Sequence, residues 1–477
     1  MAVQAVPGFD LQPSAQRVPL ESNYITNFDF LNQYLPDTYE KEFERYGNRT
    51  ISSFLRMVGA EMPSNSDLIK WAEQGRLHTK YVDVTTPALI NADDAVFTVN
   101  DAGNPAFGAS NSIAIRTGQT VFISDNAGGG SVKGIVTDVD YANKTFDVAF
   151  YPAAGIPVAG AGKKFSVWIY GSEFKKGTLG MSNSLESDDF IFDNSPIILK
   201  DKYEVSGSDM AQIGWIEVTT ENGASGYLWY LKSEHETRLR FDDYLETAMI
   251  EAVPAEAGGG VAAVAATSPV GNKGSKGIFY EVGQRGNVYG GGNPTTLAEW
   301  DSIISRLDKQ GAIEENVVFV DRDYSFDIDD MLSQQSSNAA GGVSYGLFDN
   351  EKEMALNLGF TGFRRGYDFY KSDWKYLNDP TMRGDLPSVA GSGKVSGLLV
   401  PAGSTSVYDQ ILGKNAKRPF LHVRYRASET EDRRYKTWIT GSAGGARTSS
   451  LDAMEVNFLS ERAVCVLGAN NFFLFNA

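Results

Sequence analysis

The chain has 477 residues, 42% of them hydrophobic and 22% charged, which is the composition of a folded protein and allows roughly two to four domain-sized units. Its single cysteine excludes an intrachain disulfide, and its three scattered histidines (His78, His235 and His422) exclude most zinc sites and most histidine-dependent catalytic triads. The 60 acidic and 43 basic residues give a net charge of −17, so the protein should repel nucleic acid overall.

The N-terminal region, residues 1–85, is predicted to be an arm followed by helices. Prolines interrupt its first part, which has no hydrophobic periodicity and favours an extended arm. Helices are predicted over residues 38–45 and from a cap at Asn65 or Ser66 to a closing Gly75. No secretory signal is predicted at the N-terminus, and no apolar run approaches the roughly 20 residues of a membrane helix.

Residues 86–172 are predicted to form an inserted β-rich domain. Short runs of alternating apolar residues are separated by turn clusters such as residues 125–130, with no helical period between them. Strands at this spacing are typical of a small antiparallel barrel or sandwich. The insertion is expected to leave and rejoin a host strand at residues 84–87 and 171–172. The side chains expected to face its core are Val99, Ile115, Ile135, Val139, Phe146, Val148, Phe165 and Val167.

Residues 173–222 are predicted to form a long polar hairpin. Ile197, Leu199 and Tyr203 alternate with polar residues after the acidic stretch 186–189. A hairpin with so few apolar side chains on either face cannot build its own core. Two interpretations follow: the hairpin lies on a neighbouring subunit, or it is an ordinary two-stranded excursion that packs on its own domain.

The strongest predicted helix lies within residues 223–256. Pro254 should end it, and the Gly- and Ala-rich residues 255–277 that follow predict a flexible loop. Helical spacing places a set of apolar side chains on one face, which predicts that this face is buried. The set is Phe241, Leu245, Ala248, Met249 and Ala252.

Residues 257–415 have the pattern of a compact α/β region. Thr296 and Glu299 have the spacing of a capping box at the start of a helix. The expected buried stripe of that helix is Leu297, Trp300, Ile303, Ile304 and Leu307. The remaining predicted elements are a buried strand at residues 317–320, a helix at 325–335, and strands around 359–369 and 397–401.

The last region, residues 416–477, is predicted to return as strands. The alternation after Pro419 indicates a half-exposed strand with His422 on its polar side. Residues 463–467 and 472–475 are apolar throughout and predict buried strands, the first of which would bury the cysteine as a small hydrophobic side chain.

Three patterns have a functional interpretation, and each has a more ordinary one. Residues 342–346 match a nucleophile elbow, but a polar loop precedes them where a buried strand is needed. Residues 321–330 resemble a calcium loop, but Phe326 stands at the glycine position, so an acidic helix start is favoured. The glycine-rich residues 283–292 lack a phosphate-binding motif and predict a loop. No catalytic, cofactor-binding or metal-binding residue is therefore assigned.

Arginines cluster at two places in the sequence. The ordinary interpretation is a solvated face or pairing with the acidic excess, and the alternative is pairing between subunits with the acidic hairpin. The clusters are Arg364 with Arg365, and Arg424 and Arg426 with Arg433 and Arg434.

The order of these parts resembles the Hong Kong 97-type major capsid protein of tailed bacteriophages. The stretches that carry the resemblance are residues 186–218 as E-loop, 228–252 as spine helix and 296–320 as the entry to the A-domain, with 397–401 and 462–475 as closing segments. The length, the insertion and the ending ERAVCVLGANNFFLF are most similar to crAss-like phages. The resemblance implies an α+β fold with an N-arm, an E-loop hairpin, a P-domain with a long spine helix, an A-domain and an inserted small barrel.

The resemblance also implies a structural protein with no enzymatic activity and no cofactor. Its copies would assemble in the cytoplasm of a bacterial host into the pentamers and hexamers of an icosahedral virion. This head would enclose double-stranded DNA without binding it specifically, and would meet portal, scaffold and decoration proteins but no membrane. In some family members an E-loop lysine forms a crosslink, and the sequence does not choose among Lys175, Lys176, Lys200 and Lys202. The alternatives are an encapsulin-type compartment shell, a tail sheath or β-rich adhesin and, more distantly, a hydrolase.

Overall fold

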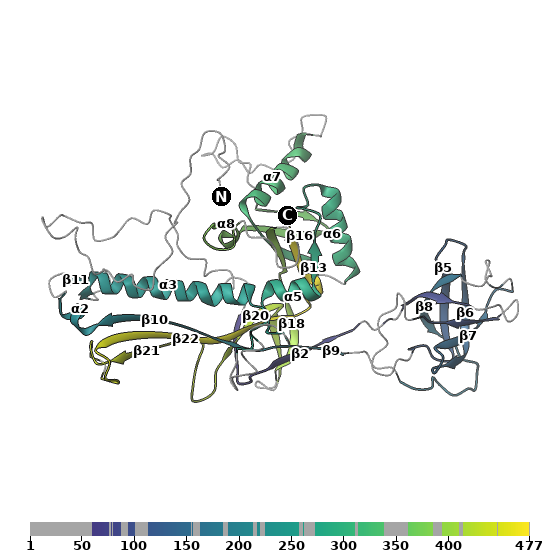
Figure 1. Ribbon diagram of the computed structural model, residues 1–477. Coiled ribbons are helices and arrows are strands. Elements are labelled where there is room, and N and C mark those ends of the chain that lie inside the picture. The colour runs from purple at the N-terminus through teal and green to yellow at the C-terminus, as the bar shows by residue number, and fades with distance from the viewer. Residues whose placement is uncertain are drawn as a thin grey trace. The chain divides into compact units, whose positions relative to one another are not determined.

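The computed structural model divides the chain into two compact units, which are treated separately (Figure 1). The larger unit combines Met1–Lys70 with Asp193–Ala477, and the smaller one is Trp71–Phe192. The arm, the helix expected at 38–45 and the elbow match at 342–346 lie outside the described residues. The residues that the structure describes are 60–75, 78, 80–86, 94–100, 113–153, 155, 163–184, 189–212, 217–219, 225–256, 261, 272–310, 313–337, 361–384, 394–409, 414–445 and 447–476.

One sheet of the larger unit is built around the long strand β22 (Ala453–Val466). On one edge, β22 pairs antiparallel with β20 (Leu421–Arg426) and β21 (Lys436–Gly441). On the other edge it pairs antiparallel with the whole of β10 (Ile197–Ser206). The strand β1 (Ala60–Ser64) joins the sheet by pairing parallel with β20. A single strand near the C-terminus therefore holds together segments from across the sequence.

The long helix α3 (Leu228–Glu251) lies along this sheet (Figure 1). Phe241, Leu245 and Met249 on its predicted face are buried, which confirms the stripe, and the helix ends before Pro254 as expected. The ring of Phe241 packs on that of Phe458 in β22, with the centroids 5.8 Å apart. Burial of one such side chain contributes about 1.5–3 kcal/mol, so packing on the sheet stabilises the helix. Short elements precede α3: α2 (Gly207–Gln212) and the paired strands β11 (Glu217–Thr219) and β12 (Ser225–Tyr227).

A second sheet of the larger unit has helices on both faces. Among the described residues its strand order is β13 (Asn287–Tyr289), β23 (Phe473–Asn476), β17 (Val395–Pro401), β14 (Glu315–Val320), β16 (Tyr367–Asp373) and β15 (Gly362–Arg365). Successive side chains of β17 point to opposite faces of this sheet. Leu399 packs with α6 (Leu297–Lys309) and α7 (Arg322–Ser337) on one face. Leu398 packs with α5 (Ile278–Arg285) and α8 (Lys375–Asn378) on the other. The remaining elements are the hairpin β18 (Ser404–Asp409) and β19 (Lys414–Pro419) and the 3-10 turn η2 (Ala469–Asn471).

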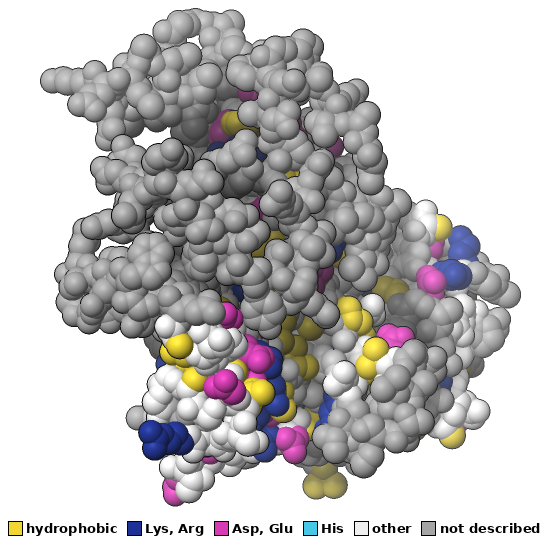
Figure 2. Space-filling view, turned by 60° about the vertical axis from the view of Figure 1, so that its left-hand side comes forward, with side chains coloured by type: hydrophobic (Ala, Val, Ile, Leu, Met, Phe, Trp, Pro, Cys, Tyr) yellow, Lys and Arg dark blue, Asp and Glu magenta, His cyan; other side chains and the backbone are white. Residues whose placement is uncertain are grey.

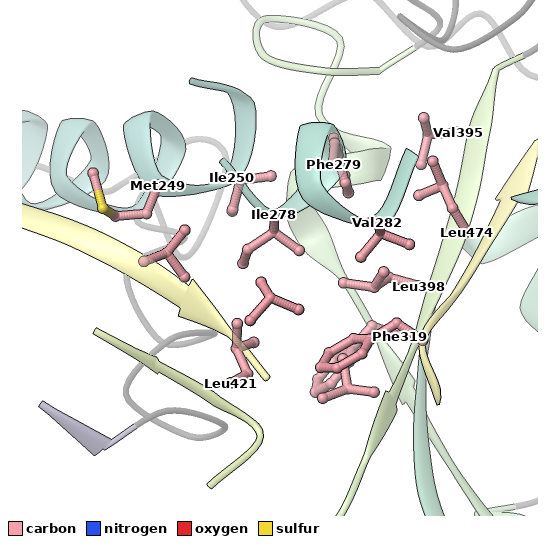
Figure 3. Close-up of a cluster of buried hydrophobic side chains, with 14 of the residues drawn as sticks. Met249, Ile250, Ile278, Phe279, Val282, Phe319, Val395, Leu398, Leu421 and Leu474 are labelled. Carbon is pink, nitrogen blue, oxygen red and sulfur yellow. The ribbon is translucent and has the colours of Figure 1, made fainter. Parts of the chain in front are cut away.

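The core on the α5 side joins the two sheets of the larger unit (Figure 3). Leu421 comes from the sheet of β22, whereas Leu398 and Leu474 come from the second sheet. The end of α3 contributes Met249 and Ile250 to the same cluster. The two sheets therefore form one packed body.

The capping box at α6 is confirmed. The Thr296 hydroxyl accepts a hydrogen bond from the Glu299 backbone amide, and the Glu299 carboxylate accepts one from the Thr296 amide. Trp300, Ile303 and Leu307 are buried as predicted. These local signals depend only on neighbouring residues, which is why they could be found in the sequence.

In the described part of the smaller unit, six strands close into a barrel in the order β3–β4–β7–β6–β5–β8. Its core is aromatic at the centre, where the ring of Phe97 stacks on Phe146 at 5.5 Å and meets Phe165 edge-on at 5.8 Å. The predicted barrel is thereby confirmed. The strands are β3 (Lys80–Thr85), β4 (Asp94–Thr98), β5 (Gln119–Asp125), β6 (Ser131–Asp140), β7 (Thr145–Phe150) and β8 (Lys164–Ser172).

The barrel differs from the prediction in two respects. Its first strand begins at Lys80, so Val84, expected in a flank of the insertion, lies within β3 and is fully buried in the core. Ile135 lies on the outer side of β6, because Val132 and Val136 take the inward positions. A bulge after Val136 then turns the strand so that Val139 packs on the core again, as predicted.

The helix expected from Asn65 or Ser66 to Gly75 is wrong. The Ser66 hydroxyl accepts a hydrogen bond from the Leu68 amide, but this contact closes a local turn. Strand β2 (Ile69–Gln74) follows and pairs with β9 (Asp189–Asn194). The side chains of β2 alternate in exposure, which is a period of two that competes with the helical pattern. The segment is a strand and not a helix because it pairs with β9, which lies far along the chain.

The hairpin expected at 173–222 is also corrected. Its apolar residues belong to β10, which pairs over its full length with β22, from Ile197 opposite Arg462 to Ser206 opposite Ala453. The interpretation that this segment packs on its own domain is therefore the right one. The loop expected at 283–292 contains the end of α5 and the strand β13.

Candidate assembly surfaces

The two-stranded ribbon of β2 and β9 exposes apolar side chains. Phe190 and Ile191 of β9 are 57% and 69% exposed. Trp71 of β2 and Phe192 of β9 pack against each other, with ring centroids 6.4 Å apart. An exposed apolar strand is a surface for association, since it can gain burial only from another molecule or another part of the chain. The ribbon takes β9 from the predicted hairpin segment 173–222, but its other strand, β2, comes from residues far earlier in the chain.

The root of the ribbon is fixed by the buried side chain of Asn194. Its amide nitrogen donates to the carbonyls of Lys276 at 2.9 Å and Val464 at 2.7 Å. Its oxygen accepts from the Ser275 hydroxyl at 3.0 Å and from the Lys276 amide at 2.9 Å. The neighbouring Asp193 accepts from Lys276 Nζ at 2.6 Å, and this hydrogen bond lowers the pKa of Asp193. The side chain of Asn194 thus ties the end of β9 to β22 through Val464 and to the segment before α5 through Ser275 and Lys276.

In the second cluster, Arg426, Arg433 and Arg434 form ion pairs within the chain, whereas Arg424 donates a hydrogen bond to the Pro63 carbonyl. Arg433 lies 2.6 Å from the carboxylate of Glu461, and Glu61 pairs with both Arg434 and Arg462. Arg426 pairs with Asp67. In the first cluster, Arg364 pairs with Asp368 and Arg365 with Asp301. On the face seen in Figure 2, blue and magenta side chains likewise lie close together. These pairs support the ordinary interpretation of both clusters, and pairing between subunits stays a prediction.

A groove of about 570 Å³ runs along the outer side of α3. Tyr244 and Thr247 of α3 line it, facing Tyr376 and Arg383. The Glu251 carboxylate accepts hydrogen bonds from Tyr376 Oη at 2.7 Å and from Arg383 Nη1 at 3.1 Å. Burial and this carboxylate raise the pKa of Tyr376, which keeps the phenol protonated as a donor. These hydrogen bonds connect α3 with the opposite wall of the groove, so Glu251, Tyr376 and Arg383 already have partners within the chain.

The acidic stretch 321–330 serves the start of α7. Asp321 accepts a hydrogen bond from the Tyr324 amide at 2.8 Å, which caps the helix, and its other oxygen lies 3.2 Å from Lys394 Nζ.

Among the described residues there is no group of His, Cys, Asp and Glu side chains that could hold a metal ion. Within that same part of the chain, every helix is too short or too polar to cross a membrane.

His422 and Cys465 are paired across β20 and β22 and are both buried. The prediction of a half-exposed strand with His422 on its polar side is therefore wrong: β20 is an inner strand, paired with β1 on one edge and β22 on the other, and His422 is buried. Burial, with the nearby Arg424 charge, lowers the pKa of His422 to about 4, so the imidazole is neutral at physiological pH. Burial raises the pKa of Cys465 to about 12, which makes the thiol unreactive and confirms its role as a small core residue.

Two features of these surfaces were missed in the sequence. Asn194 carries no local signal, because its partners lie about 80 and 270 positions away. The outer face of β8 did carry one: Trp168 and Tyr170 occupy the positions that alternate with the buried Phe165 and Val167. Polar side chains are expected at such positions, so exposed aromatic side chains there indicate a surface that binds another molecule.

No family model matches the sequence, and no curated protein matches it. Solved structures from phages and a gene-transfer-agent particle match the chain at low TM-scores. One from Gordonia phage Cozz is 10% identical, covers 98% of this chain and 99% of its own, and has a TM-score of 0.39. The capsid of a native gene-transfer-agent particle is 9% identical, with 93% and 96% covered and a TM-score of 0.41. The cyanophage Pam1 capsid is 12% identical, with 65% and 82% covered and a TM-score of 0.36. At such TM-scores the likeness carries no conclusion on function, and the resemblance to crAss-like phages gains no support from it.

Proposed function

We propose that this chain is the major capsid protein of a tailed-phage-type particle and has a structural, non-enzymatic role. Its copies form the pentamers and hexamers of a closed icosahedral shell around double-stranded DNA. The ribbon of β2 and β9 acts as the E-loop, α3 as the spine helix of the P-domain, and the second sheet with its helices as the A-domain. Portal and scaffold proteins are the further partners that such a shell requires.

The observation that carries the proposal is the arrangement of α3, the sheet of β22 and the ribbon. The helix is packed along a long antiparallel sheet, and the ribbon leaves the same body at Asn194, next to β22. The ribbon exposes apolar side chains that its own strands cannot cover, such as Ile191. A body with such an extension gains burial when copies associate, which is the physical requirement of a self-assembling shell.

The charge of the chain fits a container for DNA. A net charge of −17 repels the phosphate backbone, so a shell made of this protein would hold its genome without adhering to it. A protein that binds DNA specifically would instead need a basic face, and the arginine clusters are paired with carboxylates such as Glu61 and Glu461. This charge argument favours enclosure over binding.

Electron microscopy of the purified protein, expressed with and without a scaffold protein, tests the proposal. Closed shells with fivefold vertices are the expected result. Tubes would indicate a tail sheath, and a strictly monomeric species under both conditions would contradict the proposal. Mass spectrometry of purified shells separates the remaining alternative, since a stoichiometric cargo protein would indicate an encapsulin-type compartment.

A further inference from the structure

The barrel carries a row of aromatic and basic side chains across four neighbouring strands. Lys80 of β3 is opposite Trp168 of β8, Trp168 is opposite Phe122 of β5, and Phe122 is opposite Lys133 of β6. At about 4.8 Å per strand, the row spans roughly 14 Å. Trp168 is 46% exposed, and Lys133 lies over the ring of the adjacent Tyr170 at 5.6 Å. We call these four cross-strand residues the aromatic row.

The barrel also carries three carboxylates whose charges are not balanced. Asp94 of β4, Asp147 of β7 and Asp138 of β6 all take outward positions, and Asp138 is directly opposite Asp147. Within the described part of the chain, none of the three is in an ion pair. Partial burial and the charges of Asp138 and Asp94 raise the pKa of Asp147. We call these three residues the carboxylate side.

The strand order places the centres of these two surfaces on opposite sides of the barrel. In the closed order β3–β4–β7–β6–β5–β8, β7 is three strands from β8 in either direction, and β4 is three strands from β5. Trp168 and Phe122 are therefore opposite Asp147 and Asp94. One barrel cannot bring its own two surfaces together, whereas two copies can.

We propose that the aromatic row of one copy docks on the carboxylate side of the barrel of a second copy. The charges are complementary, because Lys80 and Lys133, which form no ion pair within the described residues, would meet Asp138 and Asp147. The aromatic rings would supply the buried apolar centre that stable contacts need.

Two different surfaces in one contact make it head-to-tail. Such a contact repeats from copy to copy and closes into a ring when the rotation allows it, whereas a contact between identical surfaces stops at a dimer. The proposal thus names the contact between barrels within a capsomer, and in this respect it rests on the proposed function. The partner surface follows from charge complementarity and does not depend on the proposed function: it is the carboxylate side of a second copy of this chain.

Charge exchange in the full-length chain tests this contact. Lys80→Glu with Lys133→Glu places carboxylates against carboxylates, and Asp138→Lys with Asp147→Lys places lysines against lysines. Each double variant should associate at least about tenfold more weakly than the parent, because like charges in a contact cost several kcal/mol. The chain that carries all four changes has complementary surfaces again and should recover association. Ring oligomers are measured by mass photometry and particles by electron microscopy.

Controls separate the contact from folding and from net charge. Lys273→Glu with Lys375→Glu makes the same change in charge at exposed residues outside the barrel, and should leave association unchanged. Circular dichroism should give the same melting curve for all variants. Trp168→Ser should weaken association whatever the charges. Failure of the fourfold variant to recover would overturn the proposal.

Other outcomes would also overturn it. If all variants associate like the parent while Trp168→Ser abolishes binding to an immobilised glycan array, the aromatic row serves a carbohydrate. If the parent forms shells and no variant differs from it, the barrel contact is wrong and the proposed function stands. If the parent never associates, the proposed function fails together with the contact.

Discussion

The side-chain amide of Asn194 donates a hydrogen bond of 2.7 Å to the backbone carbonyl of Val464, and so joins residues 270 positions apart in the chain. This contact lies where β9 ends and where β22 enters the core shared by the two sheets. The Asn194 side chain is 2% exposed, and both its amide nitrogen and its amide oxygen are hydrogen-bonded. Asn194 therefore anchors the end of β9 to the larger unit.

Asn194→Ala should destabilise the larger unit by about 2–4 kcal/mol, because it leaves buried carbonyl and hydroxyl groups without partners. Urea denaturation followed by circular dichroism measures the loss. Asn143→Ala is the matched control, since Asn143 lies in an exposed turn, where its side chain donates a hydrogen bond to Asp140. Equal effects of the two substitutions would show that Asn194 has no special part in the fold.

Leu245→Asp should cost several kcal/mol, because it places an unpaired charge on the face of α3 that packs on β22. The expected result is insoluble or non-assembling protein. His235→Asp, on the exposed side of the same helix, should remain soluble and assemble. Soluble and normally assembling L245D protein would show that the buried face of α3 has been misassigned.

Lowering the pH should destabilise the fold through His422. Its pKa is about 4 in the folded chain against an ordinary 6.5, so the unfolded chain binds a proton in this window that the folded chain does not. Stability should therefore fall as pH decreases from 6.5, by about 2–3 kcal/mol at pH 4.5. His422→Gln removes the titrating group but not the neighbouring Arg424 and Arg418. A variant with the same slope of stability against pH as the parent would contradict this assignment.

The barrel should fold alone only if β3 is included. A fragment of residues 78–176 contains all six strands and the core residues Tyr81 and Val84, and should give a cooperative melt. A fragment of residues 86–170 lacks β3, which leaves β4 and β8 with open edges, and should not. Circular dichroism of the two fragments measures the difference. If the shorter fragment melts cooperatively, closure of the barrel is not needed for its stability.

The sequence predicted best those features whose causes are local. The capping box at Thr296 and the buried stripe of α3 depend on residues within a few turns of one helix, so spacing alone reveals them. The barrel was also predictable, because its strands follow one another along the chain with few long connections. Ile135 shows the limit of such alternation: one bulge changes which side of a strand faces the core.

Features decided by distant partners could not be predicted. Ile69–Gln74 has both helical and strand periodicity, and pairing with β9 decided between them. The strand β10 looked unsupported because its partner β22 begins about 250 residues later. β20 looked like a half-exposed strand because β1, which pairs with it and makes it an inner strand, comes from a distant part of the chain. The candidate surfaces also depend on distant partners: Asn194, at the end of the ribbon, can be recognised as important only from its contacts with residues far along the chain.

The way the smaller unit is attached has an evolutionary consequence. Its chain enters through β2 and returns through β9, two strands that pair with each other. Any foreign domain whose own ends lie one strand spacing apart, about 5 Å, could replace the barrel without changing a hydrogen bond of the larger unit. The ribbon is thus a natural splice point, where recombination between genomes can exchange the module and where a peptide or an enzyme could be grafted for display.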